Sequence, residues 1–106
     1  MASSLVKLTT INNLASGQST TRNWNNATPA KAVWYIQAVP LESSFPTPIQ
    51  TEESVEVETT RVWRKLIRTV TSSDVQPFKF EYEIWYTIKN VGAKEVDVDV
   101  YASIIS

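Results

Sequence analysis

The stretch "FKFEYEIWYTIKN", residues 78–90, decides the fold, because its side chains alternate almost without a break. Apolar or aromatic residues occupy every even position from 78 to 88, and four of the six odd positions from 79 to 89 are charged. Successive side chains of a β-strand point to opposite faces, so the pattern predicts a strand with one face in the core. Trp85 is the exception, since it places a large ring on the charged side.

The stretch "VGAKEVDVDVYASI", residues 91–104, continues the alternation after a turn. If the chain reverses at "NVGAK", a hairpin forms in which Lys89 faces Glu95 and Ile88 faces Val96. The apolar even positions of both strands then share one sheet face, because a slip of one residue would turn all of them outward. This predicted core face comprises positions 78, 80, 82, 84, 86, 88, 96, 98, 100, 102 and 104.

A second reversal, at "TSSDVQP", would pair the preceding segment with the same strand. In that register Lys65 faces Glu83 and Trp63 faces Trp85. Both pairs lie on the side opposite the core face. The register therefore predicts a tryptophan pair on the outer face of the sheet.

The same register places Arg64 and Arg68 on the core side of the sheet, which would bury their charges. Charged side chains are rarely buried in protein cores. A β-bulge at residues 59–61 would exchange the side chains that point to the two faces of the strand. Alternatively, "VWRKLIRTV", residues 62–70, is a short helix with an apolar stripe. We expect the strand, because residues 59–70 are rich in β-branched threonine, valine and isoleucine.

The remaining sequence also favours strands. Gly17 and Gly92 are expected in turns that need a positive φ, and residues 40–54, with three prolines, form the one long connection. The predicted strands cover residues 4–11, 18–24, 31–39, 54–70, 77–89 and 95–105. We therefore expect a single domain, residues 1–106, that is an all-β antiparallel β-sandwich of immunoglobulin-like type with about six or seven strands.

The stretch "FEYEIWYTIKNVGAKEVDVDVYASI", residues 80–104, resembles the closing hairpin of immunoglobulin-like and fibronectin-type modules of bacterial and phage proteins. In those modules an alternating apolar strand ends in Asn and an x-Gly turn, and a valine-rich strand follows. This chain departs from true immunoglobulin domains because it has no cysteine pair. The resemblance implies a scaffold, spacer, adhesin or binding unit, and it carries over no functional residue.

The composition excludes several kinds of chemistry. The 106 residues include no histidine and no cysteine, which removes the nucleophilic triads and the usual zinc ligands. We therefore expect no catalytic residue, no metal site and no cofactor. The net charge of −1, with both signs mixed, argues against nucleic acid as a partner. The basic residues 61, 64, 65 and 68 are expected to be neutralised by Glu81 and Glu83 on the neighbouring strand.

The chain has no stretch long enough to predict a membrane span. Its first residues, "MASSLVKL", lack the basic and apolar regions of a signal peptide. We expect a cytoplasmic protein or a processed module, and the sequence leaves the localisation open between them.

The aromatic residues are the main candidates for a binding surface. Trp34 lies in a strand that is apolar on both sides and is expected in the core, whereas Trp24 fits either a core edge or a ligand-facing loop. The outward face of the C-terminal sheet is expected to be exposed or covered by the 40–53 connection. The interface or stacking candidates are Trp24, Trp63, Trp85 and Tyr101, the last three on one outward face, and the secondary candidates are Phe45, Asn23, Asn25 and Asp99.

Three functions fit these residues. The leading hypothesis is a non-enzymatic structural or protein-binding module that self-associates either through the aromatic face or through an edge strand, because monomers seldom expose large apolar patches. The alternative is a carbohydrate-binding module whose tryptophan and tyrosine rings stack on sugars. A third reading is a hydrolase that uses Asp97 and Asp99, although paired carboxylates are also typical of any solvated strand face.

Overall fold

The computed structural model describes residues 3–25, 27, 31–42, 54–71, 75 and 77–106, and this part of the chain is all-β. Its strands are β1 (Ser3–Leu14), β2 (Ser19–Trp24), β3 (Val33–Pro40), β4 (Val57–Val70), β5 (Phe78–Asn90) and β6 (Val96–Ile105). Residues 62–70 belong to β4 and are not a helix. The prediction of an all-β antiparallel chain is therefore confirmed.

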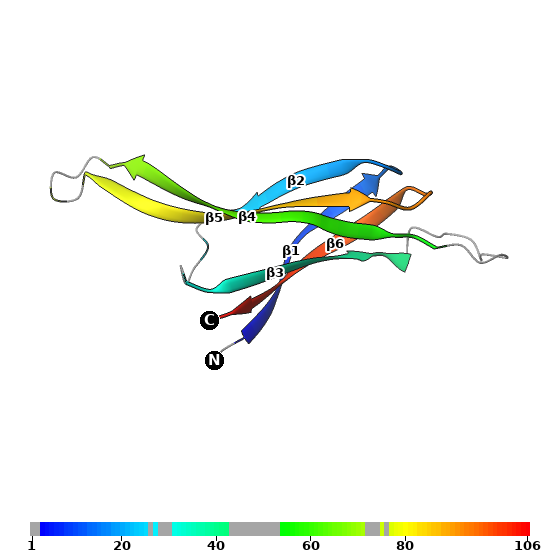
Figure 1. The fold of residues 1–106 in the computed structure, drawn as a ribbon, viewed down its shortest axis with the longest axis horizontal. Coiled ribbons are helices and arrows are strands. Elements are labelled where there is room, and N and C mark those ends of the chain that lie inside the picture. Colours follow the sequence, from blue (N-terminus) through cyan, green and yellow to red (C-terminus); the bar gives the residue numbers. More distant parts are fainter. Residues whose placement is uncertain (1–2, 26, 28–30, 43–53, 72–74, 76) are drawn as a thin grey trace.

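The strands form two three-stranded antiparallel sheets, with the orders β1-β6-β3 and β2-β5-β4 (Figure 1). Side chains from both sheets meet in one apolar core. Its largest fully buried apolar side chains are Tyr86, Leu14, Ile84, Ile88, Val96, Val98 and Val100. Ser3 of β1 pairs with Ile105 of β6, so the N- and C-terminal ends of the described strands lie side by side.

The hairpin predicted between residues 77–89 and 95–105 is wrong, because β5 and β6 belong to different sheets. The connection of residues 91–95 crosses from one sheet to the other. Ile88 and Val96 consequently enter the core from opposite layers and do not pair in one ladder. The inward orientation of the even positions is still confirmed from 84 to 88 and from 96 to 102, since both arrangements require the same alternation.

The ladder between β4 and β5 has the predicted register. Trp63 lies opposite Trp85, and Lys65 lies opposite Glu83. Here the two strands are joined by a local reversal and lie next to each other in one sheet. Side-chain pairing rules therefore identified the correct partners.

A bulge interrupts this ladder between Thr59 and Arg61. Before the bulge the odd positions, such as Val57, face the core, and after it the even positions do so. Arg64 remains on the same face as its partner Ile84. The bulge is thus present where the sequence suggested one, but it does not turn the arginines outward.

The two glycines serve different purposes. Gly17 has a φ of 78°, as expected for the turn between β1 and β2. Gly92 does not have the predicted positive φ. A Cβ atom on Gly92 would lie 2.9 Å from the backbone nitrogen of Glu56, so this position needs glycine because two backbone segments approach closely.

The molecule is elongated, with principal extents of 66 × 30 × 20 Å. Its radius of gyration is 17.6 Å, whereas a compact domain of this length would have a value of about 13 Å. Figure 1 shows one cause: at one end, β4 and β5 continue beyond the opposite sheet.

Candidate functional site: an overhanging arm and two aromatic faces

The overhanging ends of β4 and β5 form a two-stranded arm, defined here as Leu66–Val70 together with Phe78–Tyr82. The pairs run from Leu66 opposite Tyr82 to Val70 opposite Phe78. One face of the arm continues the core face of β5, and we call it the inner face. Its residues are Leu66, Arg68, Val70, Phe78, Phe80 and Tyr82 of the arm, together with Arg64, which precedes the arm on the same face of β4.

Most side chains of the inner face are apolar, and all of these except Tyr82, which packs partly buried against the core, are exposed. Leu66 is 54% exposed, Phe80 56%, Phe78 42% and Val70 82%. The rings of Phe78 and Phe80 pack edge to face with their centroids 5.7 Å apart. The prediction that positions 78 and 80 belong to the core is therefore wrong, because the described part of the β1-β6-β3 sheet does not extend over this end of β5.

Two arginines lie on the aromatic rings of this face. The guanidinium of Arg68 is 5.4 Å from the ring centroid of Phe78, and that of Arg64 is 5.7 Å from the ring of Tyr82. Arg64 also donates a hydrogen bond to the carbonyl oxygen of Ala32. Both side chains remain exposed, so the strand can carry arginines on its inner side without burying their charge.

The outer face of the same sheet carries a stacked tryptophan pair. The rings of Trp63 and Trp85 are 6.0 Å apart and inclined by 26°. Arg61 lies 4.1 Å from the ring of Trp63, and Lys65 lies 3.9 Å from that of Trp85. The indole nitrogen of Trp85 donates to Glu83 Oε1 at 3.0 Å. Both indoles are half-buried and each already has a cation over its face.

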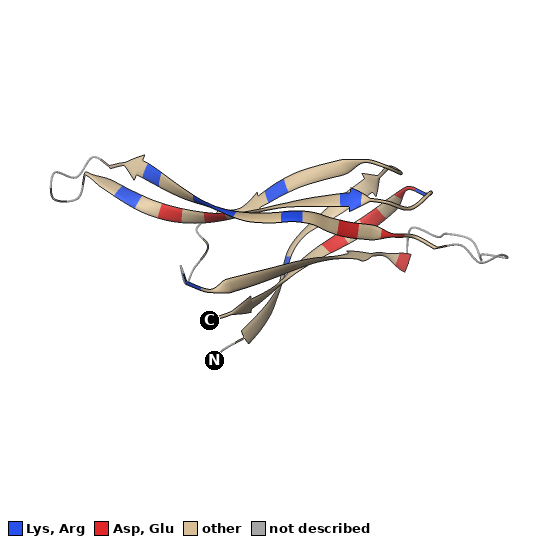
Figure 2. Cartoon of the chain, viewed as in Figure 1, with Lys and Arg blue, Asp and Glu red and all other residues tan. Residues whose placement is uncertain are grey.

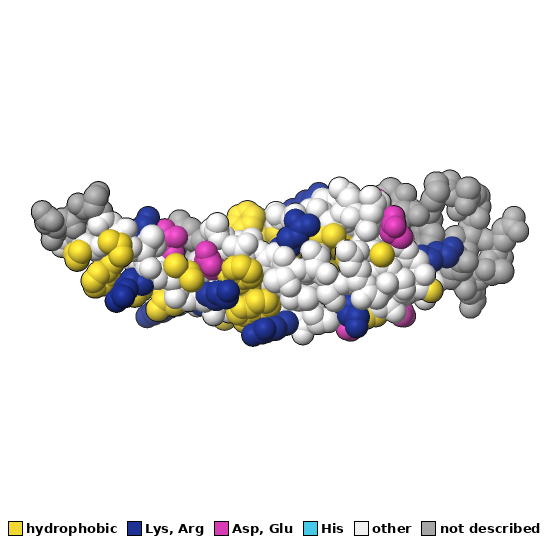
Figure 3. Space-filling view, turned by 90° about the horizontal axis from the view of Figure 1, so that it is seen from above, with side chains coloured by type: hydrophobic (Ala, Val, Ile, Leu, Met, Phe, Trp, Pro, Cys, Tyr) yellow, Lys and Arg dark blue, Asp and Glu magenta, His cyan; other side chains and the backbone are white. Residues whose placement is uncertain are grey.

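The basic residues of β4 therefore divide between two faces. Two lie over the tryptophans and two over the arm aromatics. Of the acidic residues expected to neutralise them, Glu81 forms an ion pair with Lys79 at 3.1 Å, and Glu83 accepts the bond from Trp85. Seen from above in Figure 3, hydrophobic side chains gather toward the arm with basic and acidic side chains among them, while the rest of this side carries few hydrophobic side chains and scattered charges.

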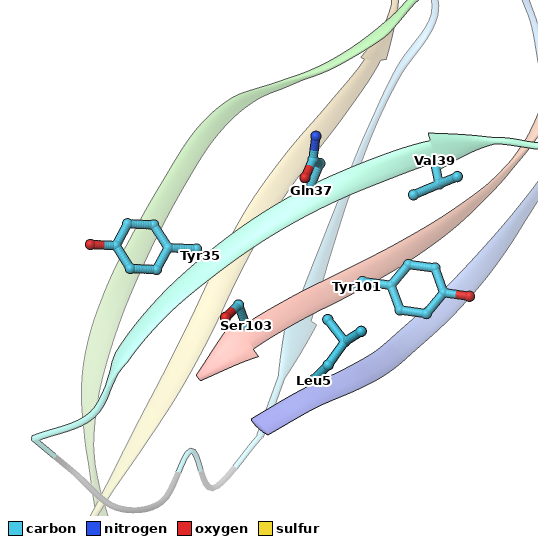
Figure 4. Close-up of a pocket in the computed structure, with 6 residues that line it drawn as sticks. All are labelled: Leu5, Tyr35, Gln37, Val39, Tyr101 and Ser103. Atoms are coloured by element: carbon cyan, nitrogen blue, oxygen red, sulfur yellow. The ribbon is translucent and has the colours of Figure 1, made fainter. Parts of the chain in front are cut away.

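Tyr101 lies on the opposite side of the molecule from the tryptophan pair. The prediction that it shares their face is wrong, because it assumed that β6 lies beside β5 in one sheet. Phe45, a secondary candidate in the 40–53 connection that was one of two alternatives for covering that face, lies outside the described residues. Tyr101 instead faces a hollow of about 350 Å³ on the outer face of the β1-β6-β3 sheet (Figure 4). The hollow is lined by Leu5, Tyr35, Gln37, Val39, Tyr101 and Ser103.

The carboxylates of β6 on this outer face hold β1 in place. Asp99 accepts a hydrogen bond from the hydroxyl of Thr10 at 2.7 Å and forms an ion pair with Lys7 at 3.2 Å. The Thr10 hydrogen bond, aided by the Lys7 charge, holds the pKa of Asp99 below its ordinary value. Asp97 accepts a hydrogen bond from the backbone N–H of Asn13 at 2.8 Å. These contacts give both side chains a structural role.

The other candidates lie at the edges of these surfaces. Trp34 is buried, as predicted, and Trp24 packs against it with ring centroids 6.5 Å apart, so Trp24 is a core-edge residue. Asn23 lies opposite Trp85 in the sheet, and its amide donates to the Asn25 side chain at 2.6 Å. Asn23 therefore lies next to Trp85 on the outer face, on the side of Trp85 opposite Trp63.

The described ranges show neither a metal-binding cluster nor a membrane-spanning helix. These residues contain no group of three or more acidic, histidine or cysteine side chains arranged to hold a metal ion. In the same ranges there is no helix with the length and apolarity that crossing a membrane requires.

Comparisons of the chain with protein-family models, with curated proteins and with solved structures find no match.

Proposed function

We propose that the protein is a non-enzymatic structural or protein-binding module of immunoglobulin-like β-sandwich type, and that it self-associates through the inner face of its arm. The strand order supports the fold assignment. Immunoglobulin domains place strands B, E and D side by side in one sheet and C beside F in the other. The order β2-β5-β4 corresponds to the first set, and β3 beside β6 corresponds to the second.

One observation carries the functional proposal: residues of core character are exposed along one face of the arm. Leu66 of β4 and Phe80 of β5 are each more than half exposed, although Ile84 and Tyr86, farther along the same face of β5, are almost fully buried. Burying a large apolar side chain contributes about 1.5–3 kcal/mol relative to leaving it in water. A partner that covers the arm would recover a substantial part of this for each residue.

The proposal is tested by sedimentation velocity over a wide range of protein concentrations. We expect wild type to associate reversibly, and Leu66→Glu to weaken association by at least tenfold because it places a charge in the covered surface. Ile67→Glu is the matched control, since Ile67 is the next residue of β4, is also exposed and points to the outer face. A wild-type monomer at every concentration, or equal loss in both variants, would contradict the proposal.

The carbohydrate-binding alternative would use free ring faces. At the tryptophan pair, Arg61 and Lys65 occupy positions over the indoles, so a sugar could stack there only after displacing them. Titration of a glycan panel, followed by tryptophan fluorescence, tests this alternative. A saturable response that is lost in Trp85→Ala would establish it.

A further inference from the structure

The charges on the inner face restrict what can cover it. Arg64 and Arg68 are its charged side chains among the described residues of β4 and β5, and none of the described residues on this face is acidic. If two copies joined arm to arm, four guanidinium groups would meet, and the described residues of this face would bring no carboxylate to pair with them. Juxtaposed like charges oppose association. The arm therefore fits a surface that is apolar and carries negative charge.

The same chain offers such a surface on the outer face of the β1-β6-β3 sheet. Its hollow is bordered by exposed apolar side chains, with Leu5 74% exposed and Tyr35 61% exposed. Along the outward row of β6, Asp97 and Asp99 precede the hollow residue Tyr101 (Figures 2 and 4).

The charge of this outward face is opposite to that of the arm. Strands β1, β6 and β3 carry three charged side chains, the carboxylates of Asp97 and Asp99 and the ammonium group of Lys7, and these sum to −1. We call this surface the receptor face. The arm and the receptor face lie on different parts of one molecule, so a single copy can present both at once.

We propose that the partner of the arm is a second copy of this chain, which receives the inner face of the arm on its receptor face. This inference rests on the proposed function, and it specifies which two surfaces meet. Leu66 and the phenylalanines of the arm would fill the hollow beside Tyr35 and Tyr101, and Arg68 would approach the β6 carboxylates. Because the two surfaces differ, the contact is heterologous and repeats from copy to copy, giving an open chain or a closed ring.

A mixing experiment with two variants tests the inference. Leu66→Glu disables the arm and keeps the receptor face, whereas Tyr35→Gln weakens the receptor face and keeps the arm. Both positions are exposed, so neither change disturbs the core. We expect each variant alone to self-associate at least tenfold more weakly than wild type. An equimolar mixture should regain wild-type affinity and stop at a heterodimer, because only one functional arm and one functional receptor face can meet.

The outcomes separate the inference from the proposal on which it rests. If Tyr35→Gln associates like wild type and does not recruit Leu66→Glu, the receptor face is not the partner and the inference is overturned, while self-association through the arm stands. If wild type is a monomer throughout, both are overturned. Recovery in the mixture also shows that both variants are folded, because each contributes an intact surface.

Discussion

Asn90 joins three segments at the end of the core. It is fully buried, and its side-chain amide donates to the carbonyl oxygens of Leu14 at 2.9 Å and Lys94 at 2.6 Å. Its side-chain oxygen accepts a hydrogen bond from the backbone N–H of Gly92 at 2.9 Å. One side chain thereby connects the end of β1, the end of β5 and the connection to β6. These bonds fix the path of the chain from one sheet to the other.

We expect Asn90→Ala to lower the free energy of unfolding by about 2–3 kcal/mol, because buried backbone groups would lose their partners. Urea unfolding followed by tryptophan fluorescence measures this. Asn23→Ala is the control, since Asn23 is exposed and bonded only to Asn25 in the described contacts; it should change stability by less than about 0.5 kcal/mol. Equal effects of the two substitutions would contradict the role assigned to Asn90.

At the scale of elements, the tryptophan pair links β4 to β5 on the outer face. Stacked aromatic pairs contribute about 0.5–1.5 kcal/mol beyond the area they bury. We expect a double-mutant cycle with Trp63→Ala and Trp85→Ala to give a coupling energy in that range. Urea unfolding of the four proteins measures it. Additive effects would mean that the observed ring geometry contributes nothing beyond packing of each ring separately.

The two predicted strand pairings had different outcomes for a physical reason. For β4 and β5, charged and aromatic side chains on the outer face must match across the ladder, and this requirement selected the correct register. For β5 and β6, the matched residues were all apolar side chains of the core face. Apolar residues pack equally well beside one another in a sheet or across a core, so their alternation could not distinguish a hairpin from a crossing between sheets.

The conflict over Arg64 and Arg68 was the one sequence signal for the arm. The register requires them to face the core side, and burial forbids charged groups there. The structure satisfies both conditions, because Arg68 lies beyond the described part of the opposing sheet and Arg64 lies at its edge, exposed and donating to the carbonyl oxygen of Ala32. The hollow around Tyr35 and Tyr101 had no comparable signal, because it depends on β6 lying between β1 and β3. That order arises from contacts distant in sequence.

At the scale of the whole molecule, the arm should be the least stable part of the β4–β5 ribbon. Its ladder has no second layer in the described structure, whereas β6 is paired on both sides and buried. Local opening costs less where few apolar contacts are lost. We expect arm amides, residues 66–70 and 78–82, to exchange hydrogen much faster than β6 amides in dilute solution.

Raising the protein concentration should slow exchange in the arm if a second copy covers it. Mass spectrometry of peptides from dilute and concentrated samples measures the change. The β2 strand is the internal control, because it lies at a sheet edge and takes no part in the proposed contact. If the arm amides already exchange hydrogen as slowly as the β6 amides in dilute solution, the arm is not exposed in the monomer and this prediction is contradicted.

The pairing of Ser3 with Ile105 has a practical consequence for anyone labelling this protein. Both ends of the described strands emerge near Leu5 and Ser103, which border the hollow. A fluorophore attached to either end would therefore sense whether the hollow is filled, while a bulky purification tag at the same place would compete with whatever enters it.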